Sequence, residues 1–147
     1  LDGVAFLVPD ETPVIGLTLR YDRADNFWFC LLHELAHVAK HLSMSDPLII
    51  DDLDLRGKEM EMEDTIEKEA DEMASDGLIP KDIWDQEPLA DKVTTAEVYS
   101  LAAKLKIHPA IIAGRIRYER NNYKLLSRHV GSKQIRKHFP KSSTESV

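Results

Sequence analysis

A single cysteine, Cys30, occurs among the 147 residues, so the chain cannot form an internal disulfide. Runs of the roughly 20 consecutive apolar residues that a membrane-spanning helix requires are absent as well. No signal peptide is recognisable, and one unpaired cysteine suits a reducing compartment. The composition predicts a cytoplasmic protein that does not act at a membrane. We expect Cys30 to be a small buried hydrophobic residue, with a redox-active or inhibitory thiol as the alternative.

Basic residues are also few: the chain has 19 lysines and arginines and 26 acidic residues, which gives a net charge of −7. This balance argues against a general nucleic-acid binder. The charge is uneven, because residues 46–91 contain 17 acids and 4 basic residues, whereas residues 115–141 contain 9 basic residues and one acid. We expect the basic C-terminal end to be solvated surface. Weak contact with DNA or docking on an acidic partner are the alternatives.

Internal repeats and low-complexity tracts are absent too, and a chain that is 43% hydrophobic and 31% charged is long enough for one core. We expect a single α+β domain over residues 1–138 and a disordered tail over residues 139–147. Because the sequence begins at Leu1 rather than at a methionine, we also expect a longer protein whose N-terminal part is missing here.

Hydrophobic periodicity and turn residues predict the order of the elements. Two alternating segments around a proline-containing turn indicate a β-hairpin, which precedes an apolar helix. A long acidic connection follows, and its length makes it a candidate lid over a cleft. A capping-box pattern and a proline open the last two helices. The expected ranges are strands over 4–8, 14–19 and 48–50, a lid over 43–63, and helices over 25–42, 64–77, 82–86, 94–106 and 109–120.

An HExxH motif, His33-Glu34-Leu35-Ala36-His37, lies inside the first expected helix. His33 and His37 are one turn apart, so both imidazoles leave the same helical face and can bind one zinc ion. Glu34 follows the first histidine and can take a proton from a water that the ion activates. The apolar surroundings predict a buried helix, in which unpaired polar groups are costly. Hydrogen-bonded core histidines without a metal are the alternative interpretation.

A catalytic zinc site needs a third protein ligand. On a straight helix His41 would lie about 12 Å along the axis from His33, at 1.5 Å per residue, which is too far to share the ion. The better candidate is Glu67, because it shares one helical face with Asp71 and with two alanines that permit close packing. Asp71 could accept the free N–H of a ligand histidine and so fix its tautomer. Glu69 points elsewhere on the helix and is the second choice for the ligand.

These motifs resemble the ImmA/IrrE metallopeptidase family, whose pattern is HExxH, then ExxA(D/N)xxA, then a short apolar segment that ends in proline. The matching segments are residues 33–37, 67–74 and 78–80. Residues 13–20 and 109–116 are similar to a branch in which this domain follows a helix-turn-helix in HigA-type antitoxins and transcriptional regulators. Members commonly carry a bulky residue where this chain has Met73, and often threonine at the position of Cys30. Neither departure touches the zinc pattern.

The resemblance implies a small gluzincin-like fold, in which a short antiparallel β-sheet packs on a mainly helical bundle that carries HExxH. It implies a zinc ion held by His33, His37 and Glu67, with Glu34 as the catalytic base. Asp71 would support a ligand histidine. The implied activity is limited proteolysis of a repressor or an antitoxin, and the implied missing part is an N-terminal DNA-binding domain.

Several surrounding roles stay open from the sequence. His41 recurs in the family and is a candidate active-site neighbour, as is Glu69. A group must also stabilise the oxyanion of the reaction, and Tyr21, His41, Arg115 and Tyr118 are the candidates. Residues 16–19 could be an edge strand that pairs with a peptide substrate, or an ordinary structural strand. The alternative overall function is a metal-binding regulatory or partner-binding domain that cuts nothing.

Overall fold

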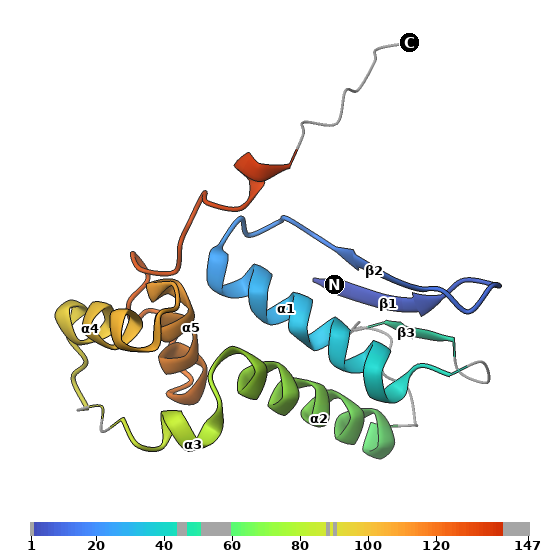
Figure 1. The fold of residues 1–147 in the computed structure, drawn as a ribbon, viewed down its shortest axis with the longest axis horizontal. Helices are drawn as coiled ribbons and strands as arrows, with labels where there is room; N and C mark the ends of the chain where they lie inside the picture. The colour runs from blue at the N-terminus through green and yellow to red at the C-terminus, as the bar shows by residue number, and fades with distance from the viewer. Residues whose placement is uncertain (1, 44–46, 51–59, 88, 90, 140–147) are drawn as a thin grey trace, which may run out of the picture.

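The computed structural model describes residues 2–43, 47–50, 60–87, 89 and 91–139 (Figure 1). These residues form an α+β fold in which a small antiparallel sheet lies against helix α1, and α2 runs beside α1 (Figure 1). Helices α4 and α5 pack together next to the N-terminal part of α1 (Figure 1). The elements are β1 (Gly3–Leu7), β2 (Pro13–Leu17), α1 (Ala24–Ala36), η1 (His37–His41), β3 (Leu48–Ile50), α2 (Met60–Leu78), α3 (Lys81–Trp84), α4 (Thr95–Leu105), α5 (Pro109–Glu119) and η2 (Arg136–His138).

The sheet has the strand order β2-β1-β3, so β1 is its central strand. Ala5, which is fully buried, pairs with Ile15 of β2 on one side and with Ile49 of β3 on the other. Both pairings are antiparallel, which confirms the expected hairpin and the short third strand. β2 ends at Leu17 rather than at Leu19, and it is an edge strand of the described sheet.

Helix α1 changes geometry at the end of the HExxH motif. It ends at Ala36, and a π-helix, η1, continues from His37 to His41. The backbone N–H of Leu42 donates to the carbonyl of His37, five residues earlier, at 2.9 Å. The expectation of one straight helix to Leu42 is therefore wrong in its last turn. π-helical turns are rare and occur frequently at functional sites.

The apolar sequence of α1 predicts burial on all sides, and the structure corrects this. His33 and Glu34 face the interior and are almost fully buried. Trp28 is 45% exposed and Leu35 is 43% exposed, so the opposite face of the helix is apolar and meets solvent. The hydrophobic residues of this segment thus serve both the core and an outer surface.

Helix α2 begins at Met60, four residues before the expected N-cap at Asp64. It also runs past Gly77, the expected stop, to Leu78, and Pro80 follows two residues later. Ala70 and Ala74 are fully buried, and α2 makes its main packing contact with α1. Two small side chains on this face allow the two helices to approach closely, as the sequence predicts.

The last helices begin as expected. Thr94 and Glu97 form a complete capping box at the start of α4, in which each side chain binds the other residue's backbone N–H. Pro109 occupies the first turn of α5, and the His108 side chain accepts a hydrogen bond from the backbone N–H of Ala110. The main hydrophobic core joins these helices to α3 and the end of α2. Its buried residues are Ile79, Trp84, Val98, Leu101, Ala102, Ile111, Ile112 and Ile116.

A buried ion pair ties α1 to α5. Arg23 donates two hydrogen bonds to the Asp25 carboxylate, at 2.9 and 2.6 Å, and the guanidinium of Arg117 lies 3.6 Å from the same carboxylate. Gly114 permits this close approach, because a Cβ atom there would lie 2.8 Å from the Cβ of Asp25. Asp25 thus anchors the first turn of the helix that carries HExxH.

Parts of two expected segments lie outside the described residues. They are residues 44–46 and 51–59 of the expected lid and residues 140–147 of the expected tail. Residues 60–63 of the expected lid belong to α2. Among the described helices, none combines the length and apolar character needed to cross a membrane.

Candidate metal centre

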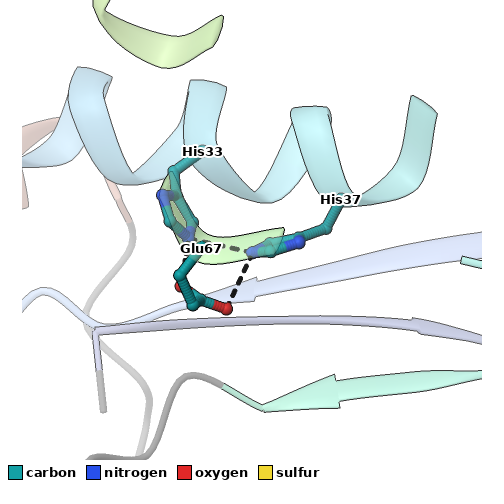
Figure 2. A group of neighbouring side chains, drawn as sticks. All are labelled: His33, His37 and Glu67. Carbon is teal, nitrogen blue, oxygen red and sulfur yellow. Dashed lines mark hydrogen bonds and ion pairs between the residues drawn. The ribbon is translucent and has the colours of Figure 1, made fainter. Parts of the chain in front are cut away.

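Three side chains from two separate segments converge below α1 (Figure 2). His33 and His37 leave the same side of the α1–η1 helix, and Glu67 reaches them from α2 (Figure 2). The two Nε2 atoms are 2.9 Å apart. The Glu67 carboxylate lies 3.1 Å from Nε2 of His33 and 3.4 Å from Nε2 of His37. All three therefore direct a ligand atom to one point.

The spacing of these atoms suits a metal ion. Ligand atoms at the 2.0–2.1 Å bond lengths of a tetrahedral zinc site are about 3.3 Å apart. The observed separations of 2.9 to 3.4 Å bracket that value. His33, His37 and Glu67 could hold a metal ion with little movement. Glu67, the preferred third ligand from the sequence, belongs to this group, and Glu69 does not.

Asp71 lies behind His33, as the sequence analysis predicts. Its Oδ1 atom is 2.9 Å from Nδ1 of His33, on the side of the ring opposite the ligand atom. A histidine that binds a metal through Nε2 usually donates its Nδ1–H to such an acceptor, which fixes the tautomer and the orientation of the ring. Glu67 and Asp71 are one helical turn apart on α2, so this helix supplies both groups.

His41 and Glu69, the two candidate active-site neighbours, lie behind His37. His41 Nδ1 lies 3.0 Å from Nδ1 of His37, and His41 Nε2 lies 3.2 Å from the Glu69 carboxylate. His41 is thus too far along the helix to join the ligand atoms, as expected, but it lies directly behind His37. The spacing of four residues between the two histidines is the signal that could have predicted this contact.

The two ligand histidines have opposite protonation tendencies. Burial alone would lower the pKa of His33, but hydrogen bonds to the Asp71 and Glu67 carboxylates outweigh it and raise this pKa to about 10. Burial lowers the pKa of His37 to about 4, and the neighbouring histidines reinforce this against the charge of Glu67. In the metal-free site His33 is therefore the protonated imidazole, and His37 is neutral.

Glu34 lies beside this group with its carboxylate against the sheet. It is 2% exposed, and a Cβ atom at Gly3 of β1 would collide with its carboxylate. Only glycine leaves room for Glu34 in this conformation. Sequence reasoning did not predict the role of Gly3, because no local pattern connects the first strand to the HExxH motif.

A cavity of about 470 Å³ adjoins the ligand group. The start of β1 and helices α1, α2 and α5 border it, and His33, Glu34 and Glu67 are among its lining residues. No residue of β2 lines this cavity, so its border on the sheet is β1 rather than residues 16–19. Cys30 also lines it and is half-buried.

The four candidates for stabilising an oxyanion are not equivalent in the structure. Tyr118 and Arg115 line the cavity, whereas Tyr21 and His41 do not. The Tyr118 hydroxyl donates a long hydrogen bond to Asp71, at 3.4 Å. Burial and the charge of Asp71 raise the pKa of Tyr118, so its hydroxyl keeps its proton at neutral pH.

No family model, no curated protein and no solved structure matches this chain. Support for the metal centre therefore comes from the geometry of its residues.

Proposed function

We propose that this chain is a zinc-dependent endopeptidase domain of the ImmA/IrrE type with a gluzincin-like fold. The observation that carries the proposal is the convergence of His33, His37 and Glu67 beside a buried Glu34 and an adjoining cavity. Two imidazoles and one carboxylate form the donor set that catalytic zinc sites use, with a position left open for water and substrate. Structural zinc sites usually have four protein ligands, so this set favours catalysis.

Each residue of the site has a role in peptide hydrolysis. Bound zinc would polarise the peptide carbonyl and lower the pKa of the attacking water. Glu34 takes the proton of that water and passes it to the leaving amine. Asp71 holds His33 in the tautomer that presents Nε2 to the ion. Tyr118 can donate its hydroxyl to the developing oxyanion from the wall of the cavity.

The natural substrate in this proposal is a regulatory protein such as a repressor or an antitoxin, cut at a limited number of sites. The protein would act in the cytoplasm, and DNA would be reached through an additional N-terminal domain. The motif resemblance supports these parts of the proposal.

Replacement of the base tests the proposal. We expect Glu34→Gln to keep its zinc and to lower the cleavage rate by about 10²- to 10⁴-fold, the usual contribution of a general base. Cleavage of a peptide library, followed by mass spectrometry, measures this effect. Glu72→Gln, at an exposed acid of α2, is the matched control and should cleave like the native protein. Full activity of zinc-loaded Glu34→Gln would overturn the mechanism.

A metal-binding regulatory domain without peptidase activity is the second candidate. The basic residues after α5 favour it, because Lys124, Arg128, Lys133, Arg136 and Lys137 are all exposed and could dock on an acidic partner. In this case Glu34→Gln would leave regulation unchanged, whereas charge reversal at Lys133, Arg136 and Lys137 would abolish it. A reporter assay with the full-length regulator distinguishes the two outcomes.

A further inference from the structure

The two ligand histidines differ in what lies behind them. The Nδ1 atom of His33 meets a carboxylate directly, that of Asp71. The Nδ1 atom of His37 meets another imidazole, that of His41, at 3.0 Å. A second carboxylate, Glu69, then follows at 3.2 Å from the far nitrogen of His41. The mechanism above uses Asp71 but leaves His41 and Glu69 without a role.

The contact between His37 and His41 lies within the π-helix. These two residues are the first and last of the π-helix, which directly follows α1. The side chain of His41 is 7% exposed, whereas Glu69 is 46% exposed, so the chain of contacts runs from the buried site to the surface. Such π-helical turns are rare and occur frequently at functional sites.

Binding of an ion by His37 would determine where the protons of His37 and His41 lie. Nε2 of His37 faces Nε2 of His33 and the Glu67 carboxylate, so it is the atom that would bind the ion (Figure 2). An imidazole that binds a metal through Nε2 carries its one proton on Nδ1, and this Nδ1–H would donate to Nδ1 of His41. Because that His41 atom accepts, the His41 proton is on Nε2 and is donated to the Glu69 carboxylate. Every nitrogen of the two rings has one consistent role.

We propose that His41 and Glu69 are positioning residues, which together hold the His37 ring in the Nδ1–H tautomer and direct its Nε2 lone pair to the metal. The inference rests on the proposed metal site. It gives His37 the same kind of support that Asp71 gives to His33, but through an intervening imidazole. Partners of this kind typically contribute 10- to 100-fold to metal affinity.

Zinc affinity in a panel of variants tests the proposal, measured by competition with a chromophoric chelator. We expect His41→Ala and Glu69→Ala to weaken binding about 10- to 100-fold. His41→Asn should bind more tightly than His41→Ala, because its Oδ1 atom is attached at Cγ like Nδ1 and can accept from His37. Lys40→Ala is the matched control. Lys40 also contacts Glu69, at 3.4 Å, but takes no part in the hydrogen bonds that link His37, His41 and Glu69. This variant should bind like the native protein.

Two results in this panel would overturn the proposal. One is a His41→Ala protein that binds zinc as tightly as the native protein. The other is a His41→Asn protein as weak as His41→Ala, because the side chain would then act through packing and not as an acceptor. Circular dichroism of each metal-free variant checks that the helices are intact.

A second measurement does not depend on the variants folding. Long-range ¹H–¹⁵N correlation spectra of the native metal-free protein at neutral pH report the tautomer of each histidine. We expect His37 and His41 to carry their protons on Nδ1 and Nε2, respectively. A proton on Nε2 of His37 would contradict the inference. Native protein that fails to bind zinc would contradict the proposed function, while these spectra would still test the His37–His41–Glu69 contacts.

Discussion

His33 and His37 carry the same side chain on the same side of one helix, yet their surroundings shift their pKa values in opposite directions. Two carboxylates raise the pKa of His33 to about 10, and burial lowers that of His37 to about 4. A metal ion can bind His33 only after its Nε2 has lost a proton. Metal binding and proton release are thus linked at this residue.

This linkage predicts that zinc binding at pH 7.5 releases about one proton, because His33 is the only ligand imidazole that is protonated there. Calorimetry in two buffers with different ionisation enthalpies measures the number of protons. Asp71→Asn removes one charge that raises the pKa of His33, so this variant should release fewer protons. A native protein that releases none would contradict the assignment.

The same shifts predict the pH dependence of the metal-free protein. The raised pKa of His33 contributes stability that is fully present below its unfolded value of about 6.5 and is lost as the pH rises through about 10. The lowered pKa of His37 contributes stability above about 6.5 that is lost as the pH falls through about 4. We expect the thermal midpoint to decrease in both directions from about pH 6.5. In Asp71→Asn the decrease on the alkaline side should be smaller.

Gly3 provides a separate test of Glu34. We expect Gly3→Ala to displace the Glu34 carboxylate, because a Cβ atom there collides with it, and so to abolish cleavage while zinc binding persists. Gly77→Ala is the control, since its Cβ would lie 3.4 Å from Leu32, an ordinary contact, within a helix that alanine favours. Cleavage and metal content are measured together. An active Gly3→Ala protein would show that the carboxylate does not depend on this close approach.

Helical spacing predicts much of the site at this scale and misses the rest for a physical reason. Residues three or four apart share a helical face, so His33 with His37, and Glu67 with Asp71, follow from the sequence. The contact of His41 with His37 also has this spacing, but the contact of His41 with Glu69 of α2 depends on how the two segments pack. The role of Gly3 depends on the packing of β1 against α1, which local sequence patterns do not predict.

At the scale of the elements, the orientation of α1 depends on contacts at both of its ends. Ala70 and Ala74 bring α2 close to the HExxH residues, and Asp25 joins the first turn to Arg117 of α5. Loss of the Asp25 carboxylate would leave the Arg117 guanidinium buried without its counter-charge. Removal of only one partner from a buried ion pair strongly destabilises a protein, because the other charge stays buried without compensation.

We therefore expect Asp25→Ala to lower the free energy of unfolding by about 3–5 kcal/mol, the usual effect of removing one partner from a buried pair. Lys81→Ala is the control, because its ion pair with Asp85 is exposed and should contribute less than about 1 kcal/mol. Urea denaturation measures both. Equal effects of the two substitutions would show that Asp25 is not a structural anchor.

Element boundaries were harder to predict than element types. The hairpin, the capped start of α4 and the proline at the start of α5 follow from strong local signals. The sequence does not locate the start of α2, because acidic residues such as Asp64 favour both an N-cap and the first turns of a helix. The sequence also predicts more burial of α1 than the structure shows, since an apolar sequence does not distinguish a core face from an exposed apolar face.

At the scale of the whole molecule, the metal centre and the main core are separate. The centre lies where β1, α1, η1 and α2 meet, whereas the largest cluster of buried hydrophobic residues joins the end of α2 to α3, α4 and α5. Helix α5 belongs to both regions, because it packs in this core and closes the cavity next to the centre. Changes at the ligands can therefore alter metal binding while the core stays intact.

The metal content of the purified protein, measured by elemental mass spectrometry, tests the central claim most directly. We expect near-stoichiometric zinc in the native protein and in Glu72→Ala, whose exposed acid lies on the same helix as Glu67. Glu67→Ala should lose most of the metal while its circular dichroism spectrum stays native. A native protein that holds no zinc after reconstitution at neutral pH would contradict the metal centre and the peptidase function with it.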